Sequence, residues 1–187
     1  MLTKNLEAEQ KLKSVVGPTE TFVWTGRPKQ GILFRTSDVL MIPFSLLWGG
    51  FALFWEVSAY AMGAPVFFLL FGSVFVIVGL YMIFGRFILD AIQRSRTTYG
   101  LTKDRAVIVS GILSTKQNYI TIKGVPDINI SEKKSGRGTI TFGPAASNFA
   151  LNFGQPAFNK MARSPVFEEI ENVRDVFNLI IKAQDKS

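Results

Sequence analysis

Neither cysteine nor histidine occurs in the 187-residue chain. Without cysteine there can be no disulfide, no thiolate nucleophile and no cysteine-based metal site. Without histidine the chain lacks the usual general base near neutral pH and the commonest metal ligand. We therefore expect a protein that is not an enzyme and that has no catalytic residues, no metal and no cofactor.

The common catalytic motifs are missing too. The sequence has no phosphate-cradling G-x-x-x-x-G-K-[ST] loop, no G-x-S-x-G elbow and no dinucleotide-binding glycine motif after a strand. The acids Glu168, Glu169 and Glu171 cluster, and paired carboxylates can hold a hard cation or do acid–base work. We instead expect them at the start of a helix, where the helix dipole stabilises negative charge.

Charged residues make up only 19% of the chain, below the roughly 25% usual in soluble domains. The deficit comes from the block Val39 to Gly85, where Glu56 is the only charged residue, and most of the net charge of +7 lies after this block. A basic domain tethered at a bilayer suits contact with anionic lipid headgroups. The positive-inside bias of membrane proteins accounts for the same excess. Nucleic acid is not expected as a partner, because no helix is rich in lysine and arginine.

The apolar block predicts two transmembrane helices, since each span takes about 20 apolar residues. Gly63-Ala64-Pro65 supplies the break between them, because proline disfavours helix at the preceding residue. We predict a helical hairpin over residues 38–85, with spans at about 38–57 and 65–84. Glu56 would lie near the outer end of the first helix, either as a solvated side chain or as part of a proton relay.

Small residues mark a packing face on each predicted helix: Ser45, Gly49 and Ala52 on the first, Gly72 and Gly79 on the second. Small side chains let helix backbones approach closely in lipid. These faces predict contact within the hairpin, and a homodimer seam is the alternative.

Lysine and arginine flank the predicted hairpin and are absent from its turn. They are Arg27, Lys29 and Arg35 before the first helix, and Arg86, Arg94 and Arg96 after the second. The positive-inside rule therefore places both ends of the chain in the cytoplasm. Trp24, Arg27, Lys29 and Arg86 are residue types that suit the headgroup layer, and we predict that they anchor the membrane interface.

Residues 1–37 form the predicted N-terminal cytoplasmic segment. Leu6, Leu12 and Val15 contribute to an irregular helical stripe, which Gly17-Pro18 ends. This stripe predicts either an amphipathic helix at the membrane interface or a solvated, frayed terminus.

Beyond the hairpin the apolar pattern changes to period two, which is typical of strands. It predicts strands at 97–101, 105–110, 113–122, 128–133, 139–142 and 165–170, with a further short strand at 150–153. Asn172 is a fair N-cap, and the apolar spacing from Val173 to Ile181 predicts a helix. Residues 96–184 are therefore expected to form a β domain with a C-terminal helix.

Several segments of this domain resemble bacterial pleckstrin-homology-like (PH-like) domains. Tyr99-Gly-Leu-Thr-Lys-Asp-Arg-Ala-Val-Ile-Val-Ser-Gly111 resembles their opening hairpin, and Ser135-Gly-Arg-Gly-Thr-Ile-Thr-Phe142 resembles their central turn and strand. Phe167-Glu-Glu-Ile170 and the helix after it resemble the closing elements, and Trp24-Thr-Gly-Arg-Pro28 is similar to membrane-anchored members. The stretch 144–165 departs from the family pattern, being rich in Phe, Asn and Ala.

Pattern and resemblance together predict a membrane α-helical hairpin plus an all-β PH-like barrel or sandwich closed by a C-terminal α-helix. The resemblance implies a non-enzymatic, membrane-anchored binding or assembly module at the cytoplasmic surface of the bacterial inner membrane. An oligomeric protein-interaction scaffold, or a small transporter or channel accessory subunit, is the alternative.

Basic residues at two turns are the predicted contacts to lipid or to a protein partner: Lys103, Arg105, Lys133, Lys134 and Arg137. Cations close to an anionic leaflet each contribute about 1 kcal/mol of attraction. Ordinary solvated turn charge is the alternative for each of them. The expected partners are the lipid bilayer with its anionic headgroups, a second copy of the chain or another membrane protein.

Overall fold

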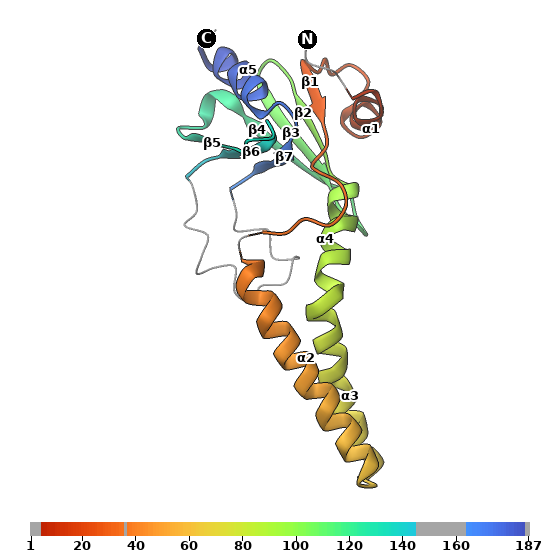
Figure 1. Cartoon of the computed structure of the whole chain (residues 1–187). Coiled ribbons are helices and arrows are strands. Elements are labelled where there is room, and N and C mark those ends of the chain that lie inside the picture. The colour runs from red at the N-terminus through yellow and green to blue at the C-terminus, as the bar shows by residue number, and fades with distance from the viewer. Residues whose placement is uncertain (1–4, 36, 145–163, 186–187) are drawn as a thin grey trace. The chain divides into compact units, whose positions relative to one another are not determined.

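The computed structural model describes residues 5–35, 37–144 and 164–185 (Figure 1). The predicted short strand at 150–153 lies outside these residues. The described chain divides into two compact units. The first takes in the residues up to Gly31 and from Ile92 onward, and the second is Ile32–Ala91.

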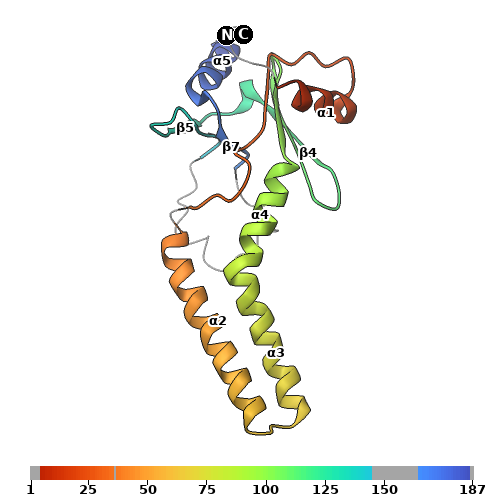
Figure 2. The same ribbon diagram turned by 45° about the vertical axis from the view of Figure 1, so that its right-hand side comes forward.

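The second unit is built from long apolar helices. Helix α2 spans Asp38–Ala61, helix α3 spans Val66–Leu80, and a π-helical turn at Tyr81–Gly85 leads into helix α4 at Arg86–Ser95. Both ribbon views show α2 and α3 running side by side in opposite directions (Figures 1 and 2). Helix α2 begins at Asp38, as the sequence predicts, but it ends at Ala61, four residues after the predicted Val57.

Glycines allow α2 and α3 to approach closely. A Cβ atom built on Gly79 would lie 2.8 Å from the Cα atom of Gly49. Ser45, Ala52 and Gly72 are buried as well. The small residues therefore serve contact within the chain, as the first of the two sequence-based alternatives predicts.

The side chain of Glu56 is not fully solvated, unlike the first of the two sequence-based alternatives. Its side chain lies across Gly72, and its Oε2 atom is buried without a hydrogen-bond partner among the described residues. Gly72 has no side chain, so it leaves room for the carboxylate between the helices.

Both long helices meet the length and composition of a membrane span. The candidate spans are Asp38–Ala61, with 24 residues, and Val66–Ser95, with 30 residues. Only 17% and 11% of their most apolar windows are buried inside the protein.

The first unit contains two antiparallel sheets. One has the order β1 (Trp24–Gly26), β2 (Thr98–Leu101), β3 (Arg105–Ser110) and β4 (Lys116–Thr121). The other has the order β5 (Ile128–Glu132), β6 (Gly138–Phe142) and β7 (Val166–Ile170). The predicted strands after residue 96 are confirmed, except that β4 begins three residues after Leu113, because Gly111 has a φ of 142° and turns the chain there.

Strand β1 joins the sheet from the other side of the apolar block. Trp24 pairs with Leu101 and Gly26 pairs with Tyr99, so two neighbouring strands are connected through all of α2, α3 and α4. The sequence assigns residues 1–37 to a separate segment, whereas this strand is part of the β unit.

An aromatic cluster around Phe167 joins the two sheets. Its ring lies 4.8 Å from that of Tyr99, 5.0 Å from Phe142 and 5.6 Å from Trp24, measured between centroids. The Tyr99 hydroxyl accepts a 3.2 Å hydrogen bond from the backbone N–H of Glu168, and burial raises the pKa of Tyr99. Trp24 is only 5% exposed, so its predicted role as an interfacial anchor is wrong.

Two helices pack on the β unit. In α1 (Leu6–Val16), Leu12 is fully buried against Phe22 and Val107. Residues 6–16 are therefore a packed helix, not a frayed segment. In α5 (Val173–Asp185) Val173, Val176 and Ile180 join the main core, and Asn172 stands at the predicted N-cap position. A short 3₁₀ helix at Ile122–Gly124 lies between β4 and β5 in the chain.

Replacing Gly79 by alanine should weaken the packing of α2 on α3. The added Cβ atom meets backbone atoms, which cannot rotate away, and overpacking of this kind costs about 1–3 kcal/mol. Gly50→Ala is the matched control, because nothing lies within 4 Å of its Cβ position. That control should be neutral or gain up to about 1 kcal/mol of helix propensity. Unfolding of the full chain in detergent measures both, and equal behaviour of the two variants would contradict the close packing.

Candidate functional site

A cleft of about 630 Å³ lies in the β unit, between segments that are far apart in the sequence. One wall is strand β1 with the residues that follow it, from Trp24 to Gln30. The other wall holds Arg137, from the β5–β6 turn, with Glu171 and Asn172 from the β7–α5 connection. Asn5, just before α1, completes the lining.

This cleft brings together four of the predicted binding or anchoring residues: Trp24, Arg27, Lys29 and Arg137. The only carboxylate among the described lining residues is Glu171. The lining therefore carries an excess of positive charge, which suits an anionic ligand. The described residues contain no cluster of three His, Cys, Asp or Glu side chains that could hold a metal ion.

Arg27 lies partly buried at the cleft. Its Nη1 atom forms a 3.0 Å ion pair with Glu7, whose side chain is 78% exposed. Its Nε atom is buried without a hydrogen-bond partner among the described residues. An ion pair with so exposed a partner is worth little, since water and salt screen it. Arg27 therefore keeps donor capacity for another anion.

The cations of the β5–β6 turn are paired with the acidic cluster. Lys133 Nζ lies 2.6 Å from Glu169, and Arg137 Nη2 contacts Glu171. Lys134 forms no ion pair among the described residues. The carboxylates of Glu169 and Glu171 thus lie beside a basic turn. Glu168 and Glu169 belong to β7, so the expectation that they lie at the start of α5 is wrong for these two, whereas Glu171 lies two residues before α5.

Backbone geometry explains this pairing. Glu169 has a φ of 50° and Asn172 a φ of 48°, both in the left-handed region that few side chains adopt. The β6–β7 register also shifts between Gly138 and Ile140. A local irregularity of this kind re-aims side chains, and here Glu169 reaches Lys133.

The first basic turn lies outside the cleft. Arg105 pairs with Glu20 and its guanidinium lies 5.4 Å from the centre of the Tyr119 ring. Lys103 is exposed and has no ion-pair partner in the described part of the chain. The structure therefore separates Lys103 and Arg105 from Arg137, although the sequence groups all three as basic turn residues.

Arg94 holds one wall of the cleft in place. Its side chain is 2% exposed and donates hydrogen bonds of 2.6 Å to the carbonyl oxygens of Lys29 and Gly31. From the sequence, Arg94 is predicted only to be a positive charge on the cytoplasmic side of the hairpin. Its spacing from Arg86 and Asp90, four residues apart along α4, is the signal that could have shown one charged helix face.

The other two charges on that face pair with residues near the start of α2. Arg86 lies 3.1 Å from Asp38, and Asp90 lies 3.0 Å from Arg35. The predicted interfacial anchor Arg86 thus forms an ion pair through its Nη1 atom. Its Nε and Nη2 atoms have no hydrogen-bond partner among the described residues. Ile88, on α4, is 56% exposed. The helix therefore buries charge and exposes an apolar side chain, the reverse of a helix on a soluble protein.

Removing the Arg94 side chain should loosen the cleft wall. Arg94→Met deletes two short hydrogen bonds from a buried guanidinium, and we expect a loss of about 1–3 kcal/mol in the free energy of unfolding. Amide exchange over residues 28–33 should become faster. Arg174→Met is the control, because Arg174 is 73% exposed and its pair with Glu132 is worth at most about 1 kcal/mol. Unchanged exchange in the Arg94 variant would show that the guanidinium does not hold the wall.

Comparison with known proteins identifies the family. The family model described as "Bacterial PH domain" matches residues 52–179, which include every strand from β2 to β7. Comparison with curated proteins and comparison with solved structures each gave no match. The matched segment spans more than half of the chain and carries the two sheets and most of α5. The chain belongs to the bacterial PH domain family.

Proposed function

We propose that this protein is a non-enzymatic binding module, anchored in the bacterial cytoplasmic membrane, whose cationic cleft binds the anionic headgroup of a phospholipid. PH-like domains are generally non-catalytic binding modules. The observation that carries the proposal is the meeting of Arg27, Lys29 and Arg137 on one cleft with a single lining carboxylate.

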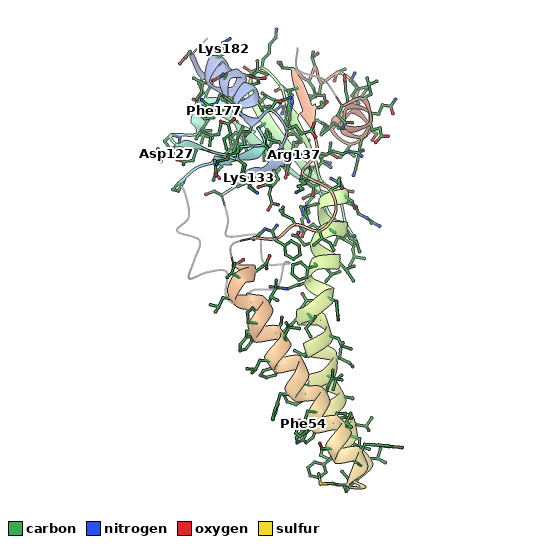
Figure 3. All side chains as sticks on the ribbon, viewed as in Figure 1. Phe54, Asp127, Lys133, Arg137, Phe177 and Lys182 are labelled. Atoms are coloured by element: carbon green, nitrogen blue, oxygen red, sulfur yellow. The ribbon has the colours of Figure 1, made fainter. Side chains whose placement is uncertain are left out.

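The apolar helices support the anchoring. At about 1.5 Å per residue, α2 is roughly 36 Å long, enough to cross a hydrocarbon core of about 30 Å. Large side chains such as Leu47, Phe54 and Phe67 are at least 70% exposed, and Figure 3 shows Phe54 pointing away from the helix pair. Leaving a side chain of this size in water forgoes about 1.5–3 kcal/mol. A core helix of a soluble protein would be mostly buried, so lipid is the solvent that fits these surfaces.

The distribution of cations supports the orientation. The described turn between α2 and α3 has no lysine or arginine, whereas Arg35 precedes α2 and Arg86 follows the π-helical turn. We assign residues 38–85 to the membrane and both termini to the cytoplasm. We assign the PH-like domain to residues 96–184 together with β1.

Guanidinium chemistry supports a phosphate-bearing ligand. Arginine donates paired hydrogen bonds in a planar fork that matches the oxygens of a phosphate. Arg27 and Arg137 are each paired with a glutamate that is at least 70% exposed, and such pairs are easily exchanged. In the sequence, only the six residues 32–37 separate Gly31 from the start of α2 at Asp38.

The oligomeric scaffold and the transporter or channel accessory subunit are sequence-based alternatives. Neither makes use of the cleft, so neither enters the proposal.

Cysteine labelling tests the anchoring, because the chain has no cysteine of its own to give background. Met62→Cys, in the exposed turn, should react with a membrane-impermeant maleimide in intact spheroplasts. Lys182→Cys, on the exposed side of α5, should react only after the membrane is permeabilised. Labelling of Lys182→Cys in intact spheroplasts, or release of the wild-type chain by an alkaline carbonate wash, would refute the proposed topology.

Titration with a short-chain lipid tests the cleft. Full-length protein in neutral detergent should bind dioctanoyl-phosphatidylglycerol more tightly than dioctanoyl-phosphatidylcholine in a calorimeter. Arg137→Gln should weaken the binding roughly tenfold, because a hydrogen bond to a charged group contributes about 1.5–3 kcal/mol.

Lys103→Gln is the matched control, since it removes one positive charge from an exposed turn outside the cleft. We expect its affinity to stay close to that of the wild type. Equal weakening by Lys103→Gln and Arg137→Gln would mean that overall charge, and not the cleft, governs the interaction.

A further inference from the structure

A second, smaller pocket of about 220 Å³ lies where α1 meets the β3–β4 connection. Lys11 and Val15 of α1, Arg96 and the residues Val109 to Thr115 line it. The lining includes two cations and the hydroxyl-bearing residues Ser110, Ser114 and Thr115. No lining residue carries a carboxylate, so the pocket concentrates donors and positive charge.

The ammonium group of Lys11 has few hydrogen-bond acceptors in this pocket. Its Nζ atom donates one hydrogen bond, of 2.9 Å, to the backbone carbonyl of Arg96. An ammonium group has three donors, so two are left for other acceptors. Burial, together with the neighbouring charges of Arg27 and Arg96, lowers the pKa of Lys11. The positive charge at this position is therefore disfavoured in the protein as it stands.

Arg96 adds a second cation with spare donors. Its Nη1 atom donates a 2.7 Å hydrogen bond to the carbonyl oxygen of Ile112, which fixes the guanidinium to the β3–β4 connection. A guanidinium has five N–H donors. Arg96 also follows directly on the last residue of α4, Ser95.

Three arginines of the same unit have glutamate partners, unlike the two cations of this pocket. Arg27 pairs with Glu7, Arg105 with Glu20 and Arg137 with Glu171. Within the described residues, neither Lys11 nor Arg96 forms an ion pair. A partly buried lysine beside an arginine, with no acid to offset them, calls for an anion from outside the chain.

The β3–β4 connection is shaped to close the pocket. Gly111 has a φ of 142°, and a Cβ atom there would collide with the carbonyl oxygen of Ser114. Only glycine allows the chain to fold back so tightly, which places Ser110 and Ser114 along the same lining. At the tip of this connection Leu113 is fully exposed.

We infer that this pocket binds a phosphate group, donated either by free phosphate or by a phospholipid headgroup, through Lys11 and Arg96. A phosphate offers several strong acceptor oxygens on one small group, which matches two cationic donors and three hydroxyls around a small cavity. The inference concerns residues outside the cleft of Arg27, Lys29 and Arg137 and does not depend on the function proposed for that cleft.

Calorimetric titration of the full chain in neutral detergent with inorganic phosphate is the first test. Lys11→Gln and Arg96→Gln should each bind phosphate at least tenfold more weakly than the wild type, whereas Lys11→Arg, which keeps the charge, should stay within threefold. Lys13→Gln is the matched control on the same helix, because Lys13 already pairs with Glu9 at 2.8 Å. Wild-type affinity in Lys11→Gln, with its helical content intact by circular dichroism, would overturn the inference.

The second arm identifies the source of the phosphate. Dioctanoyl-phosphatidylglycerol is titrated into Arg137→Gln protein, in which the cleft is impaired, with and without Lys11→Gln. Binding tenfold tighter than that of inorganic phosphate, and lost with Lys11→Gln, identifies a lipid headgroup. Binding of inorganic phosphate alone identifies free phosphate. Saturable binding of neither probe, in protein whose thermal unfolding is cooperative, would refute the site.

Discussion

The pairing of β1 with β2 is the constraint on which the rest of the structure depends. These neighbouring strands are separated in sequence by the whole apolar block, and Gly26 must lie opposite Tyr99 for the sheet to form. A chain that leaves a strand can return to its neighbour only if the intervening segment ends close to where it began. Two antiparallel helices meet that requirement, since the second retraces the length of the first (Figures 1 and 2). The close approach of Gly49 and Gly79 holds the helices together, and Arg94 fastens the chain before α2 to the end of α4.

The cationic side chains of this protein differ in whether a carboxylate lies close enough to pair with them. The turn cations Lys133 and Arg137 and the first-turn Arg105 all have glutamate partners, so their contribution to a surface potential is smaller than a count of residues implies. The cleft and the smaller pocket are each lined by more positive side chains than acids. The position of each cationic side chain relative to nearby carboxylates, and not the net charge of +7, therefore determines where an anion would bind.

Local patterns predict much of this fold. The strands of the β unit follow from period-two alternation bounded by glycine turns, and α5 follows from its apolar spacing; both signals are contained within a few residues. The partnership of β1 could not be predicted in the same way, because it joins residues across the apolar block. A signal for a strand was nevertheless present, since residues 21–25 are all β-branched or aromatic, the types that favour strands.

Side-chain partners were harder to predict than the elements that carry them. The sequence identifies Arg27, Lys29 and Arg137 as functional candidates but cannot show that they share a cleft, because their meeting depends on the packing of three distant segments. The pairing of Glu169 with Lys133 needs a left-handed backbone conformation and a register shift in a strand, neither of which alternation reveals. For Trp24 the sequence was misleading. Its residue type and its position before a predicted span favour lipid contact, whereas the structure packs its ring against Phe167.

The discontinuous β unit has a consequence for biosynthesis. A ribosome makes β1 first and reaches β2 only after all of α2, α3 and α4, which at 5–20 residues per second is a delay of roughly 4–15 s. During that interval Trp24 has neither Leu101 nor Phe167 to cover it. The β unit can thus be completed only after α2, α3 and α4 have been synthesised, so its first sheet cannot form until more than half of the chain has been made.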